Sequence, residues 1–264
     1  MDHALSPRCY AWKRHRPRGM PRLTYLSGYE RLDGEVPVIH ALGTEEPAAR
    51  LRRLLKTGTD SLSAMLGVEP PELEAFLVAD EDWEEAPRET THAYPSGLPY
   101  FTRSVRPPSL VLPEKLSFAL RPRTEATYPL AVWHELAHAF LLKGDVVRTP
   151  AWLREFVPQT ASAAIALRAG LPLHEHLNRI ESEPGFTIRG LKGHADADRQ
   201  MAFQNLLLLL GAAAVEEFGE GFLKRLVHAL WEEKDIVSED RAAELLADVL
   251  GPGGWAWLRS RPEF

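Results

Sequence analysis

The sequence has little of what stabilises small secreted domains or anchors a chain in a membrane. It contains one cysteine, Cys9, among 264 residues, which excludes an internal disulfide framework and fits a reducing compartment. The longest apolar run, LLLLLGAAAV, is followed directly by Glu216 and is shorter than the roughly 20 residues of a membrane span. No apolar segment resembling a secretory signal follows the first basic residues. We therefore expect a soluble, cytoplasmic protein without a membrane partner.

The sequence also has no excess of basic over acidic residues. The formal net charge of −6 argues against nucleic acid as a partner, since such binding gains its free energy from a basic face that releases counterions. The N-terminus alone is locally basic, and we interpret residues 1–22 as a solvated arm in preference to a partner-docking arm. Its basic residues include Lys13, Arg14, Arg16, Arg18 and Arg22.

The remaining composition, 45% hydrophobic and 26% charged, is that of a globular protein with a sizeable core. Short β-rich runs dominate the first part of the chain, together with one amphipathic helix expected over residues 45–67. Pro107 and Pro108 lie between the last two of these runs, so we expect this part of the sheet to be an edge or a turn, with residues 109–113 as a candidate edge strand. The predicted strands are residues 22–26, 36–42, 74–79, 100–105 and 109–113.

From about Thr124 the apolar residues recur with helical spacing. The pattern predicts α+β architecture, in which a small sheet-bearing part, residues 23–120, packs against a mostly helical part, residues 121–264. The predicted helices of the second part are residues 125–143, 150–169, 195–218, 220–233 and 238–250.

The stretch AVWHELAHAF, inside the first of these helices, places polar groups in apolar surroundings. His134 and His138 are four residues apart, so they project from the same helix face and can reach one small cation. Zinc suits imidazole ligands, and its catalytic sites use three protein ligands and one open position. Glu135 lies about 100° around the helix, where its carboxylate can take a proton from bound water. The stretch therefore predicts a zinc site, and a third ligand must come from another segment.

The segment PAWLREFV, at the start of the next helix, supplies a glutamate. HELAHAF followed by PAWLREFV resembles the gluzincins, zinc peptidases with His-Glu-x-x-His on one helix and a glutamate ligand on the next. The resemblance implies a thermolysin-like catalytic architecture and one zinc ion per chain. It also implies that His134, His138 and Glu155 are the ligands and that Glu135 is the general base. Trp152 and Leu153 would pack so as to orient the glutamate.

The sequence departs from that family pattern in three respects. Phe156 replaces the small residue that usually follows the third ligand, and Pro158 predicts that the helix kinks or ends soon after. The tyrosine that stabilises the oxyanion in many relatives is missing, which leaves His194 as a candidate oxyanion donor. No Gly-x-Met-Glu-Asn segment is present, so we expect an endopeptidase acting on a peptide or protein substrate in preference to an aminopeptidase.

Three alternatives stay open at this point. His194 could be the third ligand in place of Glu155. The chain could also be a gluzincin-fold domain that binds zinc without peptidase activity and serves as a binding or regulatory module. A metal-free helical interaction protein would require both motifs to be coincidental. His174 and His176, two residues apart, do not share a helix face, and we expect them at the surface.

Overall fold

The chain folds into two compact units, each described here by itself. A computed structural model describes residues 28–88, 97–117, 120–141, 149–181, 185–189 and 197–264. The sheet unit comprises the described residues up to Lys56 and Pro71–Ser117, and the helical unit comprises Thr57–Pro70 and the described residues from 120 onward. A mixed α and β protein with a small N-terminal sheet and a mostly helical remainder is thereby confirmed. The division at residues 22 and 120 stays a prediction, and the basic arm lies outside the described residues.

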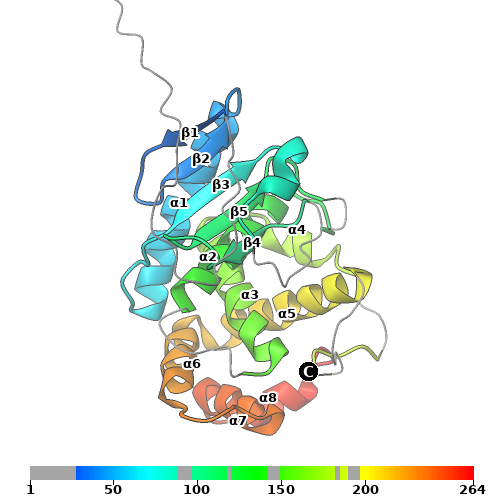
Figure 1. Cartoon of the computed structure of the whole chain (residues 1–264). Coiled ribbons are helices and arrows are strands. Elements are labelled where there is room, and N and C mark those ends of the chain that lie inside the picture. The colour runs from blue at the N-terminus through cyan, green and yellow to red at the C-terminus, as the bar shows by residue number, and fades with distance from the viewer. Residues whose placement is uncertain (1–27, 89–96, 118–119, 142–148, 182–184, 190–196) are drawn as a thin grey trace, which may run out of the picture. The chain divides into compact units, whose positions relative to one another are not determined.

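The sheet unit contains five strands in the order β1-β2-β3-β5-β4 (Figure 1). Strands β2, β3 and β5 are parallel, while β1 and β4 pair antiparallel with β2 and β5. Trp83 and Tyr100 meet edge-on with ring centroids 5.6 Å apart in an apolar cluster of this unit. The strands are β1 (Tyr29–Leu32), β2 (Val38–Ala41), β3 (Glu74–Val78), β4 (Tyr100–Thr102) and β5 (Ser109–Pro113).

The edge position predicted for residues 109–113 is wrong. Strand β5 pairs on both sides, with β3 and with β4, and all five of its residues are buried. Its two preceding prolines lie in the connection from β4, where a missing backbone N–H removes no ladder bond. The edge strands are β1 and β4. Strand β1 was not predicted because its sequence, YERL, is largely polar, whereas β4 lies within the predicted run at residues 100–105. The strand expected at residues 22–26 lies outside the described residues.

The helical unit is built around three long helices that pack on one another, α2 against α3 and α3 against α5 (Figure 1). The sequence located these helices to within a few residues but did not predict the short helices α4 and α8 or the 3-10 turn η1 (Asp80–Glu85) of the sheet unit. The helices are α1 (Glu45–Leu66), whose last part belongs to this unit, α2 (Thr127–Leu141), α3 (Ala151–Arg168), α4 (Leu173–Leu177), α5 (Ala197–Phe218), α6 (Gly221–Glu232), α7 (Glu239–Leu250) and α8 (Gly254–Ser260).

The helix does not end soon after Pro158, which was one of the two outcomes expected. Helix α3 continues for ten residues beyond it, to Arg168. Proline removes one backbone hydrogen bond and costs roughly 3 kcal/mol in a helix interior, so another contribution must offset it. Pro158 itself is buried, together with most residues of the following turns, and α3 contacts both α2 and α5. Burial of apolar surface on two sides keeps the helix continuous.

Within the described residues, α5 is the one helix long and apolar enough to cross a membrane by length and composition. In this structure it packs against α3, and Leu207 and Leu210 are fully buried. Helices in the core of a protein have the same composition, because they too contact apolar groups on most sides. The localisation drawn from the sequence stays a proposal.

The α3–α5 contact depends on Gly211. A Cβ added there would lie 2.9 Å from the Cα of Thr160 and would collide with the hydroxyl of that residue. The Thr160 hydroxyl has little freedom to move, since it donates to the carbonyl of Phe156 at 2.7 Å. Only glycine lets the two helices approach this closely.

We expect Gly211→Ala to destabilise the protein by about 1–3 kcal/mol, the usual cost of overpacking a core. A lowered midpoint of urea unfolding, followed by circular dichroism, would show it. Gly221→Ala is the matched control, because the nearest atom to its added Cβ is a flexible arginine nitrogen at 3.8 Å. Equal midpoints for the two variants would contradict the close-packing argument.

Candidate metal centre

The candidate site begins with a partly accessible stripe on an otherwise buried helix. Ten of the fifteen residues of α2 are buried, including the flanking Trp133 and Phe140. Glu135 and His138 are among the partly exposed ones, and the His134 side chain retains 10% of its surface. The apolar positions hold α2 in the core, which leaves the three polar side chains on the face that solvent can still reach.

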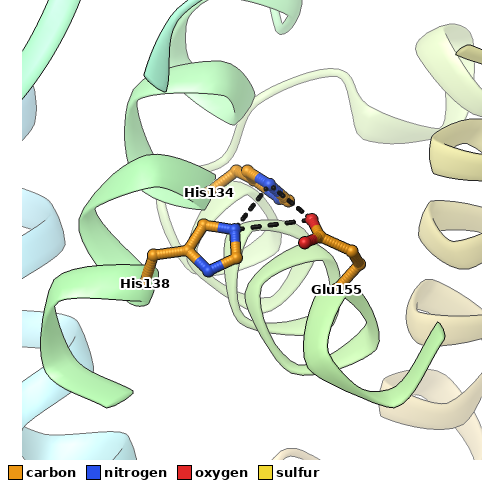
Figure 2. Close-up of side chains that lie close together, drawn as sticks. All are labelled: His134, His138 and Glu155. Carbon is orange, nitrogen blue, oxygen red and sulfur yellow. Dashed lines mark hydrogen bonds and ion pairs between the residues drawn. The ribbon is translucent and has the colours of Figure 1, made fainter. Parts of the chain in front are cut away.

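Helix α3 brings a third group to this face. Figure 2 shows the two imidazoles from one helix and the Glu155 carboxylate from its neighbour converging on a single point. Nε2 of His134 lies 3.2 Å from Nε2 of His138, and Oε2 of Glu155 lies 3.3 Å from the first nitrogen and 3.4 Å from the second. Two nitrogens and one oxygen thus form a nearly equilateral triangle.

The triangle has the dimensions expected around a small cation. Ligand atoms about 2.0–2.1 Å from a tetrahedral ion lie roughly 3.3–3.4 Å from one another, which matches the three observed separations. Each of these atoms can present a lone pair to the cluster, and three facing lone pairs would repel one another, so the group must share protons or hold a cation. His134, His138 and Glu155 could therefore hold a metal ion.

Glu135 lies beside the triangle and not within it. Its Oε1 is 3.9 Å from Nε2 of His134, which is longer than every edge of the triangle, and its side chain is 14% exposed. A carboxylate placed next to the ligands without joining them can accept a proton from a water molecule bound between them.

The charges of the site are strongly coupled. Burial lowers the pKa of the His138 imidazole, but the Glu155 carboxylate beside it raises this pKa more, and the net shift is upward. Burial alone would raise the pKa of Glu155, yet the charge of His138 and hydrogen bonds from both histidines hold it well below its usual range. Without a metal ion, the neighbouring carboxylate thus favours the protonated form of the His138 imidazole, and the histidines favour the ionised form of Glu155.

Two glutamines support the third ligand. Nε2 of Gln204, on α5, donates to Oε2 of Glu155 at 3.0 Å, and Nε2 of Gln159 donates to Oε1 of Gln204 at 2.6 Å. The sequence analysis missed both residues. Gln159 lies four residues after Glu155 on one helix face, a spacing that could have suggested it, whereas nothing in the sequence links α3 to Gln204.

No protein-family model, no curated protein and no solved structure matches the chain. The resemblance to gluzincins therefore rests on the local motifs and on the geometry just described.

The residues around Glu155 are firmly packed. Trp152 and Leu153 are buried, as expected, and the indole N–H of Trp152 donates to Glu239 of α7 at 2.6 Å. Phe156, the departure from the family pattern, is fully buried and packs against Phe222 of α6 with ring centroids 6.4 Å apart. It points into the core, so it leaves the position of the carboxylate undisturbed.

The other histidines considered in the sequence analysis do not belong to the triangle within the described residues. His194, the alternative third ligand and candidate oxyanion donor, lies outside the described residues. His174 is exposed, as predicted, but the prediction that His176 lies at the surface is wrong. Its Nδ1 is 2.7 Å from the hydroxyl of Thr124, and burial lowers its pKa to about 4, so it is a neutral core histidine.

The interaction between His138 and the Glu155 carboxylate predicts how the pKa of His138 changes on mutation. In the metal-free protein its pKa should exceed the ordinary value of 6.5, and in Glu155→Gln it should fall below, since burial remains while the carboxylate charge is gone. Because protonated imidazole cannot ligate, metal affinity of the parent should rise with pH until the raised pKa is passed. Histidine NMR titrations of both proteins measure the two values. An unchanged pKa in the variant would contradict the pairing.

Proposed function

We propose that the chain is a zinc-dependent hydrolase of the gluzincin type that cleaves peptide bonds as an endopeptidase. The observation that supports this most directly is the triangle of His134, His138 and Glu155 with the Glu135 carboxylate beside it. Three ligands leave one coordination position for water or substrate, as in catalytic zinc sites.

Zinc is the metal that the donor set favours. Two imidazoles disfavour magnesium and calcium, which prefer oxygen ligands. The same two-histidine, one-carboxylate set also holds iron in oxygenases. Hydrolysis requires a carboxylate that can act as a base next to the ligands, so the position of Glu135 supports zinc over iron.

The chemistry divides between the metal and one side chain. His134, His138 and Glu155 would hold the zinc ion, which when bound would lower the pKa of a water molecule toward 7 and polarise the carbonyl group that is attacked. Glu135 takes the proton from the attacking water at Oε1 while the water oxygen bonds to the carbonyl carbon. The carboxylic acid then gives that proton to the amide nitrogen as the carbon–nitrogen bond breaks, which regenerates the carboxylate and releases the amine.

The proposal also covers the architecture, the substrate, the partners and the location of the protein. The resemblance implies a thermolysin-like catalytic architecture and a peptide or protein substrate. The composition and charge of the sequence support the absence of a nucleic-acid or membrane partner and a cytoplasmic location. The alternative is a zinc-binding domain without peptidase activity, acting as a binding or regulatory module. The sequence of α5, which contains no tyrosine to stabilise an oxyanion, favours that alternative.

A first test separates coordination from catalysis. Glu135→Gln preserves the size of the side chain but removes the base, so the variant should retain about one zinc per chain while hydrolysis falls by 10²-fold or more. Elemental analysis and turnover of a fluorogenic peptide library, with a chelator control, measure the two properties. Parental turnover by the variant would show that Glu135 is not the base. A zinc-loaded parent that cleaves nothing in the library would favour the binding module.

A second test identifies the third ligand. Glu155→Ala leaves two imidazoles, so zinc affinity should fall by far more than the 10–100-fold typical of losing a residue that only supports a ligand. His194→Ala should keep its zinc and at most slow turnover. Zinc retained in Glu155→Ala and lost in His194→Ala would reassign the ligand. A folded parent that takes up no zinc would refute the proposed function altogether.

A further inference from the structure

The Glu155 carboxylate has two oxygens in different surroundings. Oε2 faces both imidazoles and also accepts a hydrogen bond from Gln204. Oε1 lies 4.0 Å from Nε of Arg154, the preceding residue of α3. A carboxylate is symmetric by itself and can turn about its last torsion, so its neighbours must determine which oxygen meets the metal.

The amide of Gln204 can hold the carboxylate only in one orientation. If its oxygen faced Glu155, two acceptors would meet and the contact would be repulsive. Gln159 supports the other orientation, because its N–H group donates to the Gln204 oxygen at 2.6 Å while the Gln204 nitrogen donates to Glu155. Glu155 and Gln159 lie one turn apart on α3, and Gln204 on α5 bridges them.

We propose that Gln204 is a positioning residue for the metal centre, with Gln159 fixing the direction of its amide. The pair presents Oε2 of Glu155 as the single ligand oxygen. Each oxygen of a carboxylate offers two lone pairs, so Oε2 can accept from Gln204 and still bind a cation on its other side. This inference rests on the metal-binding part of the proposed function. It extends the site to α5, which contributes Gln204 but none of the three ligands.

The amide of Gln204 should raise metal affinity in two ways. It lowers the entropy that the carboxylate loses on binding, since the side chain is already held in place. It also leaves the carboxylate negative, because a neutral donor stabilises the ionised form without cancelling its charge. Residues that orient metal ligands by hydrogen bonds typically contribute 10–100-fold in affinity.

The experiment compares zinc affinities of the purified full chain by competition with a chromophoric chelator. Gln204→Leu keeps the approximate shape but removes the donor, and its affinity should fall 10–100-fold. Gln159→Leu should lower affinity less, and it should have no further effect once Gln204 is leucine, because it acts through that amide. Asn205→Leu, the next residue of α5 and also partly exposed, is the matched control and should bind zinc like the parent.

Two further readouts separate positioning from a general loss of structure. The melting temperature of metal-free Gln204→Leu should equal that of the parent, and the visible spectrum of its Co²⁺-loaded form should change, since the carboxylate is free to bind through both oxygens. Parental zinc affinity in Gln204→Leu would overturn this inference and leave the proposed function standing. A parent that binds no zinc would overturn both. Equal losses in Gln204→Leu and Asn205→Leu would assign the effect to α5 packing and overturn the positioning role.

Discussion

The packing of α2 on α3 is the constraint on which the site depends. His134 and His138 are brought together by helix geometry alone, but Glu155 reaches them only because the two helices lie side by side. Both helices are rich in buried apolar residues, among them Phe140 and Phe156, which are almost completely buried. The burial of apolar surface therefore sets the distance between a carboxylate and two imidazoles that would gain little by approaching one another without a cation.

Polar groups at this position have a cost that the rest of the helical unit must offset. Burying ionisable side chains loses their hydration, and burial is the largest influence on the pKa of both His138 and Glu155. The interactions among the three side chains of the triangle, together with the hydrogen bond that Gln204 donates to Glu155, compensate part of this lost hydration. Such a cluster adds little to stability, because replacing a buried ion pair with apolar residues is often neutral or stabilising. Its arrangement is better explained by the binding of a cation than by folding.

The sequence was most informative where helical periodicity coincides with a characteristic spacing of metal-ligating residues. The His-Glu-x-x-His spacing located α2, and the Trp-Leu-x-Glu segment located the glutamate that the structure brings to it, because both signals are local. The position of β5 was mispredicted, since strand order depends on contacts between distant segments. Pro158 misled for a related reason, because tertiary packing overrode its local preference. Gln204 could not be predicted at all, since its role exists only through the α3–α5 contact.

All the described residues to which we assign a role belong to the helical unit, on α2, α3 and α5. Four side chains, placed by two neighbouring helices, contain the chemistry of the proposed reaction, and a third helix holds one of them in orientation. Function resides in such sites and not in whole folds, so a compact constellation can occur in a chain whose overall sequence matches no known family. The glycine at 211 then acquires a role beyond packing. By allowing α5 to approach α3 at Thr160, it keeps Gln204 within hydrogen-bonding distance of the ligand.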